Sequence, residues 1–273
     1  MTLVGPGPAV GMPLPRRIDS EPSPPVRPRR RRVRRVLFWS ALAGMAWLLV
    51  VIPPPIWYRF AQPRETAFMA LRDREATRAG EEPLARRYTP VPLEQIAPVM
   101  RRAVLIAEDH RFEEHAGFDW IEIRRALGYP RDSFDLGSAQ HRRDLRGALR
   151  RAWQGQGRVR GASTITQQVA KNLYLSPSRN PLRKVKEAVL AKRLEWMLPK
   201  DRILELYLNI AEFGPGIWGV EAASQAYFRK PAARLTRTEA AALAATLPFP
   251  RLSNPAYRPA RMRARQAVIL RRL

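Results

Sequence analysis

An acidic pair followed by two histidines is the first group of residues in this sequence that could do chemistry. Glu108 and Asp109 stand at the end of an apolar stretch with a helical period, and His110 and His115 follow. The helix dipole disfavours a carboxylate at a C-terminal end, so an acid placed there indicates a functional role. The alternative is an ordinary solvated helix end. The two histidines lack a third converging ligand, and we therefore predict no metal site.

A segment of hydroxyls and amides, residues 161–172, supplies the second group. Ser163 or Thr164 can cap a helix, and Thr164, Gln168 and Lys171 then share the face opposite its apolar residues. Free N–H groups at a helix start, together with a lysine two turns further on, can bind an anion. An amphipathic helix with a solvated polar face is the alternative interpretation.

Basic residues around a single glutamate form the third group. Arg179 precedes the run 183–187, which reads RKVKE. Arg183 and Glu187 are one helical turn apart, the spacing of an ordinary ion pair worth about 0.3–0.5 kcal/mol. The same residues could instead place a carboxylate among cations that grip a diphosphate. The spacing leaves both interpretations open.

Several other chemistries are excluded by the residue types. The chain has no Cys, which removes thiol nucleophiles, disulfides and cysteine-bound metals. It also lacks the G-x-S-x-G, P-loop and Ser-x-x-Lys patterns of common hydrolases and nucleotide-binding proteins. Residues 214–219, GPGIWG, match G-x-G-x-x-G, but they follow a helical segment and contain a proline. We therefore reject nicotinamide binding and predict a tight turn between helices.

Helices must position these groups, because helical periods dominate residues 91–273 and alternating strand patterns are scarce. Apolar residues recur at helical spacing in 93–107 and 203–210, and a capping box at 236–239 precedes an alanine-rich run. The sequence therefore predicts a mainly α domain over 91–273. Residues 128–160 indicate a mobile insertion with at most one short helix, near 142–153. A polar connector, 59–90, with a short helix at 66–79 precedes the domain.

The N-terminal part has the composition of a basic tail followed by a membrane anchor. Residues 1–35 are rich in proline and arginine, and we expect a disordered tail. Residues 36–58 carry no charge and are long enough to cross a bilayer as an uncleaved anchor. A cleaved signal peptide is disfavoured because no small-x-small site follows. Seven Arg in the fifteen residues before the span, against three in the fifteen after it, predict a cytoplasmic tail and an external domain.

The overall charge indicates anionic partners. The chain has 273 residues with 49 Lys and Arg against 24 Asp and Glu, a formal charge of +25, and its hydrophobic fraction of 45% is ordinary for a folded protein. A phospholipid surface, a nucleic acid or a phosphorylated substrate would fit that charge. Because the orientation of the anchor places the domain outside the cytoplasm, we do not expect nucleic acid to be a partner.

Taken together, the segments resemble family-51 glycosyltransferases, the peptidoglycan glycosyltransferases. The wording NIAEFG…GVEAA is most similar to the monofunctional biosynthetic transglycosylases of Gram-negative bacteria, since no Ser-x-x-Lys transpeptidase motif is present. The resemblance departs from the family in the longer gap between Asp119 and Gly161. It implies a lysozyme-like helical catalytic lobe with a small membrane-facing jaw subdomain. The matching blocks occur in the family order at 107–119, 161–172, 183–195, 202–224 and 227–248.

The resemblance implies an inverting transfer that polymerises lipid II into β-1,4 glycan strands. The 4-hydroxyl of a lipid II GlcNAc attacks C1 of the MurNAc that ends the growing strand, and undecaprenyl diphosphate leaves. It makes Glu108 the general base and Glu187 the second essential glutamate. No cofactor is obligatory, although Mg²⁺ or Mn²⁺ could assist. Residues at positions that the resemblance assigns to substrate binding are Asp109, Phe112, His115, Ser163, Thr164, Gln168, Lys171, Asn172, Arg179, Arg183 and Lys184.

The implied partners are lipid II, the growing glycan strand, inner-membrane lipid and other cell-wall synthases or divisome proteins. The implied location is the bacterial inner membrane, crossed once, with a periplasmic catalytic domain. Two alternatives belong to other classes: a lytic, lysozyme-like enzyme that cleaves glycan, and a non-catalytic membrane scaffold for cell-wall synthesis. A diphosphate leaves as a stabilised anion and needs cations rather than an acid, so the clustered cations favour transfer over cleavage.

Overall fold

The computed structural model describes residues 29–51, 55–154, 163–175 and 181–273, and the chain divides into two compact units, 1–53 and 54–273. In the first unit, α1 spans Arg29–Val51. The expected disorder of 1–35 was therefore wrong for 29–35, because arginine is a good helix former and the apolar run continues the same helix. Residues 1–28 lie outside the described residues. Among the described helices, none has both the length and the apolar character needed to cross a membrane.

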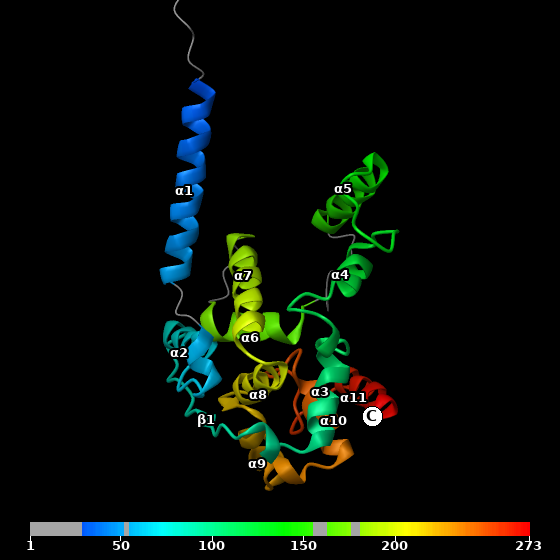
Figure 1. The fold of residues 1–273 in the computed structure, drawn as a ribbon. Helices are drawn as coiled ribbons and strands as arrows, with labels where there is room; N and C mark the ends of the chain where they lie inside the picture. The colour runs from blue at the N-terminus through cyan, green and yellow to red at the C-terminus, as the bar shows by residue number, and fades with distance from the viewer. Residues whose placement is uncertain (1–28, 52–54, 155–162, 176–180) are drawn as a thin grey trace, which may run out of the picture. The chain divides into compact units, whose positions relative to one another are not determined.

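The second unit is mainly helical, as predicted, and its strands are two or three residues long (Figure 1). The helices longer than one turn are α2 (Ala67–Arg78), α3 (Pro98–Glu108), α4 (Trp120–Leu127), α5 (Ala139–Trp153), α6 (Ile165–Tyr174), α7 (Pro181–Met197), α8 (Lys200–Ile210), α9 (Val220–Phe228), α10 (Arg237–Thr246) and α11 (Ala260–Arg272). The short 3-10 helices are η1 (Pro55–Arg59), η2 (Leu93–Gln95), η3 (Phe112–Glu114) and η4 (Ala232–Arg234).

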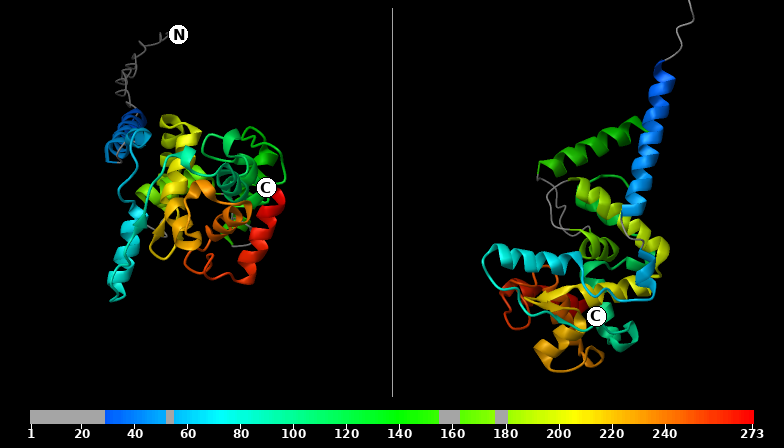
Figure 2. Two further views of the ribbon diagram at one scale, coloured as in Figure 1. Left: turned by 90° about the horizontal axis from the view of Figure 1, so that it is seen from below. Right: turned by 90° about the vertical axis from the view of Figure 1, so that its left-hand side faces the viewer.

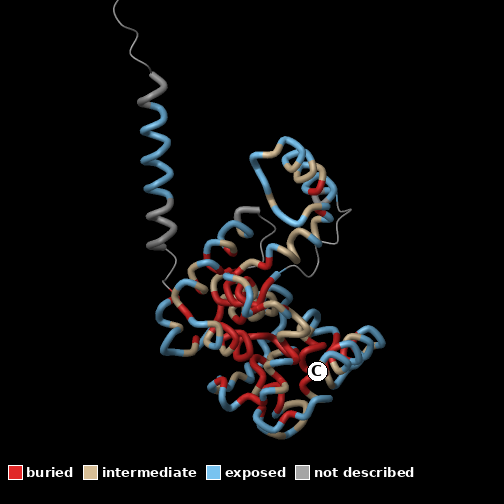
Figure 3. The backbone as a smooth tube through the Cα atoms, turned by 45° about the vertical axis from the view of Figure 1, so that its right-hand side comes forward, coloured by how far each residue is buried: buried red, intermediate tan, exposed pale blue. Residues whose placement is uncertain are grey.

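One part of the core forms around the alanine-rich helix α10. This helix packs against α3 and α11, and its alanines from Ala240 to Ala245 are buried (Figures 1 and 3). Side chains as small as alanine let the neighbouring helices approach closely. The capping box predicted at its start is present, with Thr236 accepting from Glu239 N–H and the Glu239 carboxylate bonding back. This packing fixes the C-terminal end of α3.

A second part of the core forms where α6 packs against α7, α8 and α2 (Figure 2). Ile165, Val169, Leu190 and Leu206 are fully buried and come from the apolar faces of α6, α7 and α8. The polar side of α6 is left for the residues Gln168 and Lys171. The amphipathic pattern of this helix thus decides which of its groups stay accessible.

A small sheet joins the expected connector to the helical domain. Strands β1 (Arg87–Tyr88), β3 (Ile217–Trp218) and β2 (Glu212–Gly214) lie in that order, β1 and β3 parallel and β2 and β3 antiparallel. The predicted tight turn is therefore a β-hairpin rather than a plain link between helices. Gly219 has a φ of 83°, and a Cβ there would lie 2.5 Å from the Asn209 carbonyl oxygen. Only glycine fits this approach.

Residues 59–90 are part of the folded unit. The helix predicted at 66–79 is confirmed as α2, capped by Thr66, which accepts a hydrogen bond from Met69 N–H at 3.1 Å. Met69 is fully buried against the domain, and β1 completes the sheet. The sequence marked 59–90 only as a polar connector, and the structure adds that this segment buries apolar surface against the domain.

The expected insertion at 128–160 holds a longer helix than predicted. Helix α5 begins at Ala139 rather than near 142 and has 15 residues. Ala148 is buried, and the other residues of α5 whose burial the structure describes, 139–147 and 149–151, are exposed or intermediate. The tube in Figure 3 is accordingly mostly pale blue and tan over this segment. A helix with so little buried surface gains little from packing. Residues 155–160 lie outside the described residues.

Candidate active site

The carboxylate of Glu108 ends α3 and is held between two donors. Its Oε1 accepts from Arg265 Nη2 at 2.8 Å, and its Oε2 accepts from Gln168 Nε2 at 2.9 Å. The side chain is 13% exposed. Buried Met100, Ala103 and Val104 set the orientation of α3, and this orientation brings its last residue to α6 and α11. The carboxylate is thus fixed in position and still reachable.

Burial raises the pKa of the Glu108 carboxyl above its ordinary value. The hydrogen bond from Gln168 and the positive charge of Arg265 oppose part of that rise. A carboxylate with a raised pKa binds a proton more strongly, which suits a general base working near neutral pH. Unlike the solvated helix end that was one alternative, this acid is desolvated and specifically bonded.

Sequence patterns gave no sign of Arg265. It lies 157 residues after Glu108, on an arginine-rich helix with five Arg among its 13 residues, so nothing local distinguishes it from its neighbours. Arg265 Nη2 also donates to the Ala107 carbonyl at 2.9 Å. The two bonds lock the end of α3 to α11.

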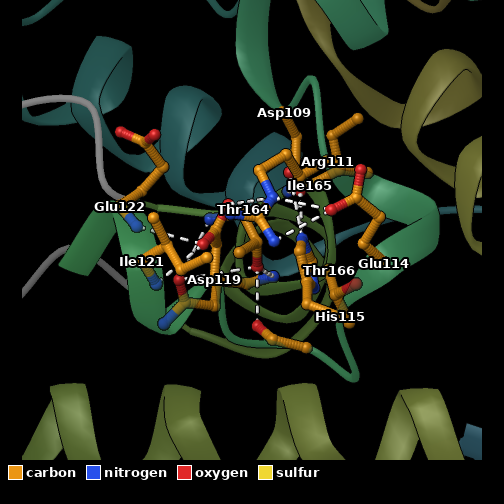
Figure 4. A network of polar contacts seen from close by, with 12 residues as sticks. Asp109, Arg111, Glu114, His115, Asp119, Ile121, Glu122, Thr164, Ile165 and Thr166 are labelled. Atoms are coloured by element: carbon orange, nitrogen blue, oxygen red, sulfur yellow. Dashed lines mark hydrogen bonds and ion pairs between the residues drawn. The ribbon is translucent and has the colours of Figure 1, made fainter. Parts of the chain in front are cut away.

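Asp109 and His115 hold the α3 end against the start of α6 (Figure 4). Asp109 Oδ2 accepts from the Ile165 N–H at 2.9 Å, and His115 Nε2 lies 3.0 Å from Asp109 Oδ1. Asp109 is buried. The predicted substrate contacts of these two residues stay predictions, since the bonds that the structure shows for them join the end of α3 to the start of α6.

Thr164 caps the first turn of α6. The sequence leaves Ser163 and Thr164 as alternative caps. The Thr164 hydroxyl accepts from Gln167 N–H at 3.2 Å and donates to the Gly117 carbonyl at 2.8 Å. The hydroxyl is therefore engaged within the protein, and its predicted contact with substrate stays a prediction. Ser163, one residue earlier, is exposed and accessible to a ligand.

Lys171 and Asn172 share a cavity with Gln168, the residue that holds Glu108. The cavity has a volume of about 160 Å³. Gln168 also accepts from the hydroxyl of fully buried Tyr207 at 3.1 Å. Glu108 is not among the residues that line this cavity, and its link to the cavity is its hydrogen bond from Gln168. The lining residues are Phe68, Arg72, Gln168, Lys171, Asn172, Tyr207, Ala211, Glu212, Leu247, Pro248 and Pro250.

Burial lowers the pKa of Lys171, and the negative charge of Glu187 raises it. Among the described residues, Lys171 has no ion-pair partner within 4.0 Å, and its ammonium lies 5.7 Å from the centroid of the Phe68 ring. Further cations near Lys171 lower its pKa as well, namely Arg183, Lys184 and Arg72. A group of cations around one accessible ammonium is suited to an anion with more than one charge.

Glu187 is buried on α7 between two of the predicted cations. Lys184 Nζ donates to its Oε1, and Arg183 Nη1 lies 3.8 Å from its Oε2. Arg183 and Glu187 are four residues apart on the helix, so the ion pair predicted from their spacing is present. Lys184 is exposed and Arg183 half-buried. Both readings of this segment thus have support, since the ion pair exists and the cations lie near Lys171. Arg179 lies outside the described residues.

Phe112 is placed in the core, and its predicted contact with substrate gains no support from that position. The side chain is 1% exposed, and the Lys200 ammonium lies 4.3 Å from its ring centroid. A buried ring in η3 packs beneath the loop that follows Glu108.

Among the described residues, no three His, Asp or Glu side chains cluster as metal ligands would.

Two further residues of the cavity, Arg72 and Glu212, were not singled out from the sequence. Arg72 comes from α2 and Glu212 begins β2, so 140 residues separate them. Arg72 Nε and Nη2 both donate to Glu212 Oε2, at 3.1 and 2.9 Å. Only the folded connector brings them together.

The arrangement combines a desolvated carboxylate with a cationic region on one side of α6. The transglycosylase family model matches residues 75–133 and 138–273, most of the second unit. The chain belongs to the transglycosylase family, the family-51 glycosyltransferases.

Relatives called biosynthetic peptidoglycan transglycosylase support this membership. One from Bordetella pertussis is 39% identical over 234 residues, which cover 85% of this chain and 87% of the relative. One from Bordetella avium is 38% identical over 245 residues, 89% of this chain and 93% of the relative. One from Escherichia coli is 45% identical over 183 residues, 67% of this chain and 66% of the relative. The residues matched by the family model include the three segments that carry the chemistry.

Proposed function

We propose that this protein polymerises lipid II into β-1,4-linked glycan strands. Family membership makes the chain a peptidoglycan glycosyltransferase of cell-wall synthesis. The observation that supports the finer proposal is that Gln168, which donates to Glu108, also lines the cavity that Lys171 lines. A base and a cation seat are what transfer to a hydroxyl, with loss of a diphosphate, requires.

The proposed reaction begins with the 4-hydroxyl of a lipid II GlcNAc next to Glu108. Its oxygen attacks C1 of the MurNAc at the end of the growing strand while its proton passes to Glu108. The bond from C1 to the phosphate oxygen breaks on the opposite face, and its electron pair leaves with undecaprenyl diphosphate. C1 is therefore inverted. Gln168 and Arg265 orient the carboxylate toward the hydroxyl.

Cations replace a general acid on the leaving-group side. The diphosphate gains charge as the bond breaks, and Lys171, Arg183 and Lys184 would stabilise that charge, with Arg179 as a fourth candidate. Glu187 lies between Arg183 and Lys184 and would hold them in place. A divalent ion bound at Glu187 could assist the reaction in addition to these cations. The rate of polymerisation measured with and without EDTA would test this.

We further propose that residues 36–58 attach the protein to the inner membrane, with the tail in the cytoplasm and the catalytic unit in the periplasm. The support is the uncharged composition of the segment and the excess of Arg before it. Attachment to the leaflet that carries lipid II raises the effective concentration of substrate. We also propose that the catalytic unit consists of a lysozyme-like lobe and a jaw subdomain that faces the membrane, and that the protein works with other cell-wall synthases.

The deciding experiment offers the purified full chain two substrates. Labelled lipid II in detergent or vesicles should yield a polymer of glycan strands, and isolated cell wall should release no soluble muropeptides. Muropeptide release without polymer would favour the lytic enzyme instead. Neither activity, from a protein that still folds, would favour a scaffold.

A further inference from the structure

One carboxylate oxygen in the cavity beside Lys171 is left without a hydrogen-bond donor. Glu212 has a side chain only 4% exposed, and both of its bonds from Arg72 go to Oε2. Among the described residues, none donates a hydrogen bond to Oε1. Oε1 is not one of the fully enclosed side-chain atoms of the described residues that lack a partner, so this oxygen keeps some contact with solvent. This atom is therefore a candidate for a bond to a ligand.

The cavity that Glu212 lines is suited to one part of a larger substrate. Its volume is about 160 Å³, below the roughly 300–1,000 Å³ of sites that enclose a whole drug-sized ligand. Besides Glu212 its lining includes the polar residues Gln168, Asn172 and Tyr207, with the aromatic residue Phe68 beside them. Such a mixture of directional polar groups and an aromatic ring suits a sugar rather than a lipid chain.

Charges of both signs line this cavity, Lys171 and Arg72 with Glu212. Lys171 and the cations near it would attract the diphosphate, whereas Glu212 would repel it. A neutral group that donates a hydrogen bond fits next to the Glu212 carboxylate. A hydroxyl or an acetamido N–H of a sugar next to the diphosphate is such a group, and a bond to a charged acceptor is about twice as strong as a neutral one.

We propose that Glu212 Oε1 binds a sugar hydroxyl or acetamido N–H of the substrate, and that Arg72 is the positioning residue that holds the carboxylate in place. This inference rests on the proposed function. Arg72 approaches from α2 and also donates to Glu75 at 2.8 Å, so its guanidinium is fixed from two sides. Helix α2 thereby contributes to substrate recognition, although it lies before the segments that carry the cations and the base.

The test combines variants of the full chain with analogues of a water-soluble, short-chain lipid II. Each analogue lacks one sugar hydroxyl, or carries an ester oxygen in place of one acetamido N–H. The variants are Glu212→Gln and Arg72→Lys. Arg86→Gln is the matched control, because Arg86 also bonds two carboxylates, Glu65 and Asp73, and lies outside this cavity.

Glu212→Gln should raise KM about 10-fold to 100-fold, with a smaller change in kcat, because its amide keeps an oxygen for Arg72 and turns N–H toward the substrate. With the unmodified protein, the analogue that lacks the bonded group should raise KM by the same factor. With Glu212→Gln that analogue should have the same KM as the complete substrate, because the two changes remove one shared interaction. Arg72→Lys should raise KM less, and Arg86→Gln should leave it unchanged.

Two results would overturn the inference while polymerisation itself proceeds. One is a KM for Glu212→Gln equal to that of Arg86→Gln, and the other is equal KM values for all analogues with the unmodified protein. The analogue series decides alone if Glu212→Gln fails to fold. A protein that makes no polymer from lipid II contradicts the proposed function instead.

Discussion

At the scale of single residues, the charge of Arg265 helps to set the pH at which Glu108 can accept a proton. Arg265 opposes the rise that burial causes in the pKa of Glu108. A base works only when deprotonated, so activity falls as the pH drops through this pKa. Arg265→Gln should raise the pKa further and move the acid limb of kcat/KM to higher pH.

The pH dependence of kcat/KM on lipid II measures this effect. Arg263→Gln is the matched control, because Arg263 lies on the same helix, is exposed and donates to the Arg258 carbonyl instead. An acid limb at the same pH in all three proteins would show that Arg265 does not act on the base.

Residues that lie within one segment were predictable, and those brought together by folding were not. Glu108, Gln168 and Lys171 stand in short patterns whose spacing left two interpretations open, and the resemblance to the family assigned their roles. Arg265 and Glu212 stand in an arginine-rich helix and a three-residue strand, where no local pattern distinguishes them. Their roles depend on contacts across 140 residues or more, which the fold alone supplies.

At the scale of elements, the cap of α6 should matter to the site as well as to stability. Thr164→Ala removes the cap and the bond to Gly117 and should cost about 0.5–2 kcal/mol of unfolding free energy. It should also lower kcat, because α6 carries Gln168 and Lys171. Thr236→Ala removes the corresponding cap of α10, which carries none of the proposed groups, and should lower stability alone.

Denaturant unfolding and lipid II polymerisation, measured on both variants, separate the two effects. If Thr164→Ala and Thr236→Ala lost the same amount of kcat for each kcal/mol of unfolding free energy that they lost, the start of α6 would have no special part in the site. Loss of kcat with Thr164→Ala alone is the expected result.

The elements themselves were predicted where a helical period was long and regular. Helix α8 followed its apolar period and α10 followed its capping box, and both bury apolar residues in the core. The hairpin at 212–218 and the start of α1 at Arg29 departed from the prediction. In the hairpin, tertiary pairing with β1 decided the structure, and in α1 the arginines extended a helix that composition alone marked as a tail.

At the scale of the whole molecule, the segment 36–58 should decide where the protein acts. Ala41→Asp with Leu42→Asp adds two charges, each costing about 2.5–3.5 kcal/mol at the centre of a membrane helix. The variant should leave the membrane fraction on vesicle flotation and lose polymerisation of vesicle-bound lipid II, while keeping activity on a soluble short-chain lipid II.

Uncharged changes at the same positions, Ala41→Val with Leu42→Ile, are the control and should behave as the unmodified protein does. Flotation of the doubly charged variant together with the vesicles would mean that another part of the molecule provides the attachment.

The most direct test of the account is the initial rate of lipid II polymerisation by Glu108→Gln. Removal of a general base should lower kcat about 10²-fold to 10⁴-fold. Because burial raises the pKa of Glu108, its ionised form destabilises the fold above that pKa, and the variant should unfold at an equal or higher temperature at neutral pH. A folded Glu108→Gln protein that polymerises lipid II at the unmodified rate would contradict the assignment of Glu108 as the base.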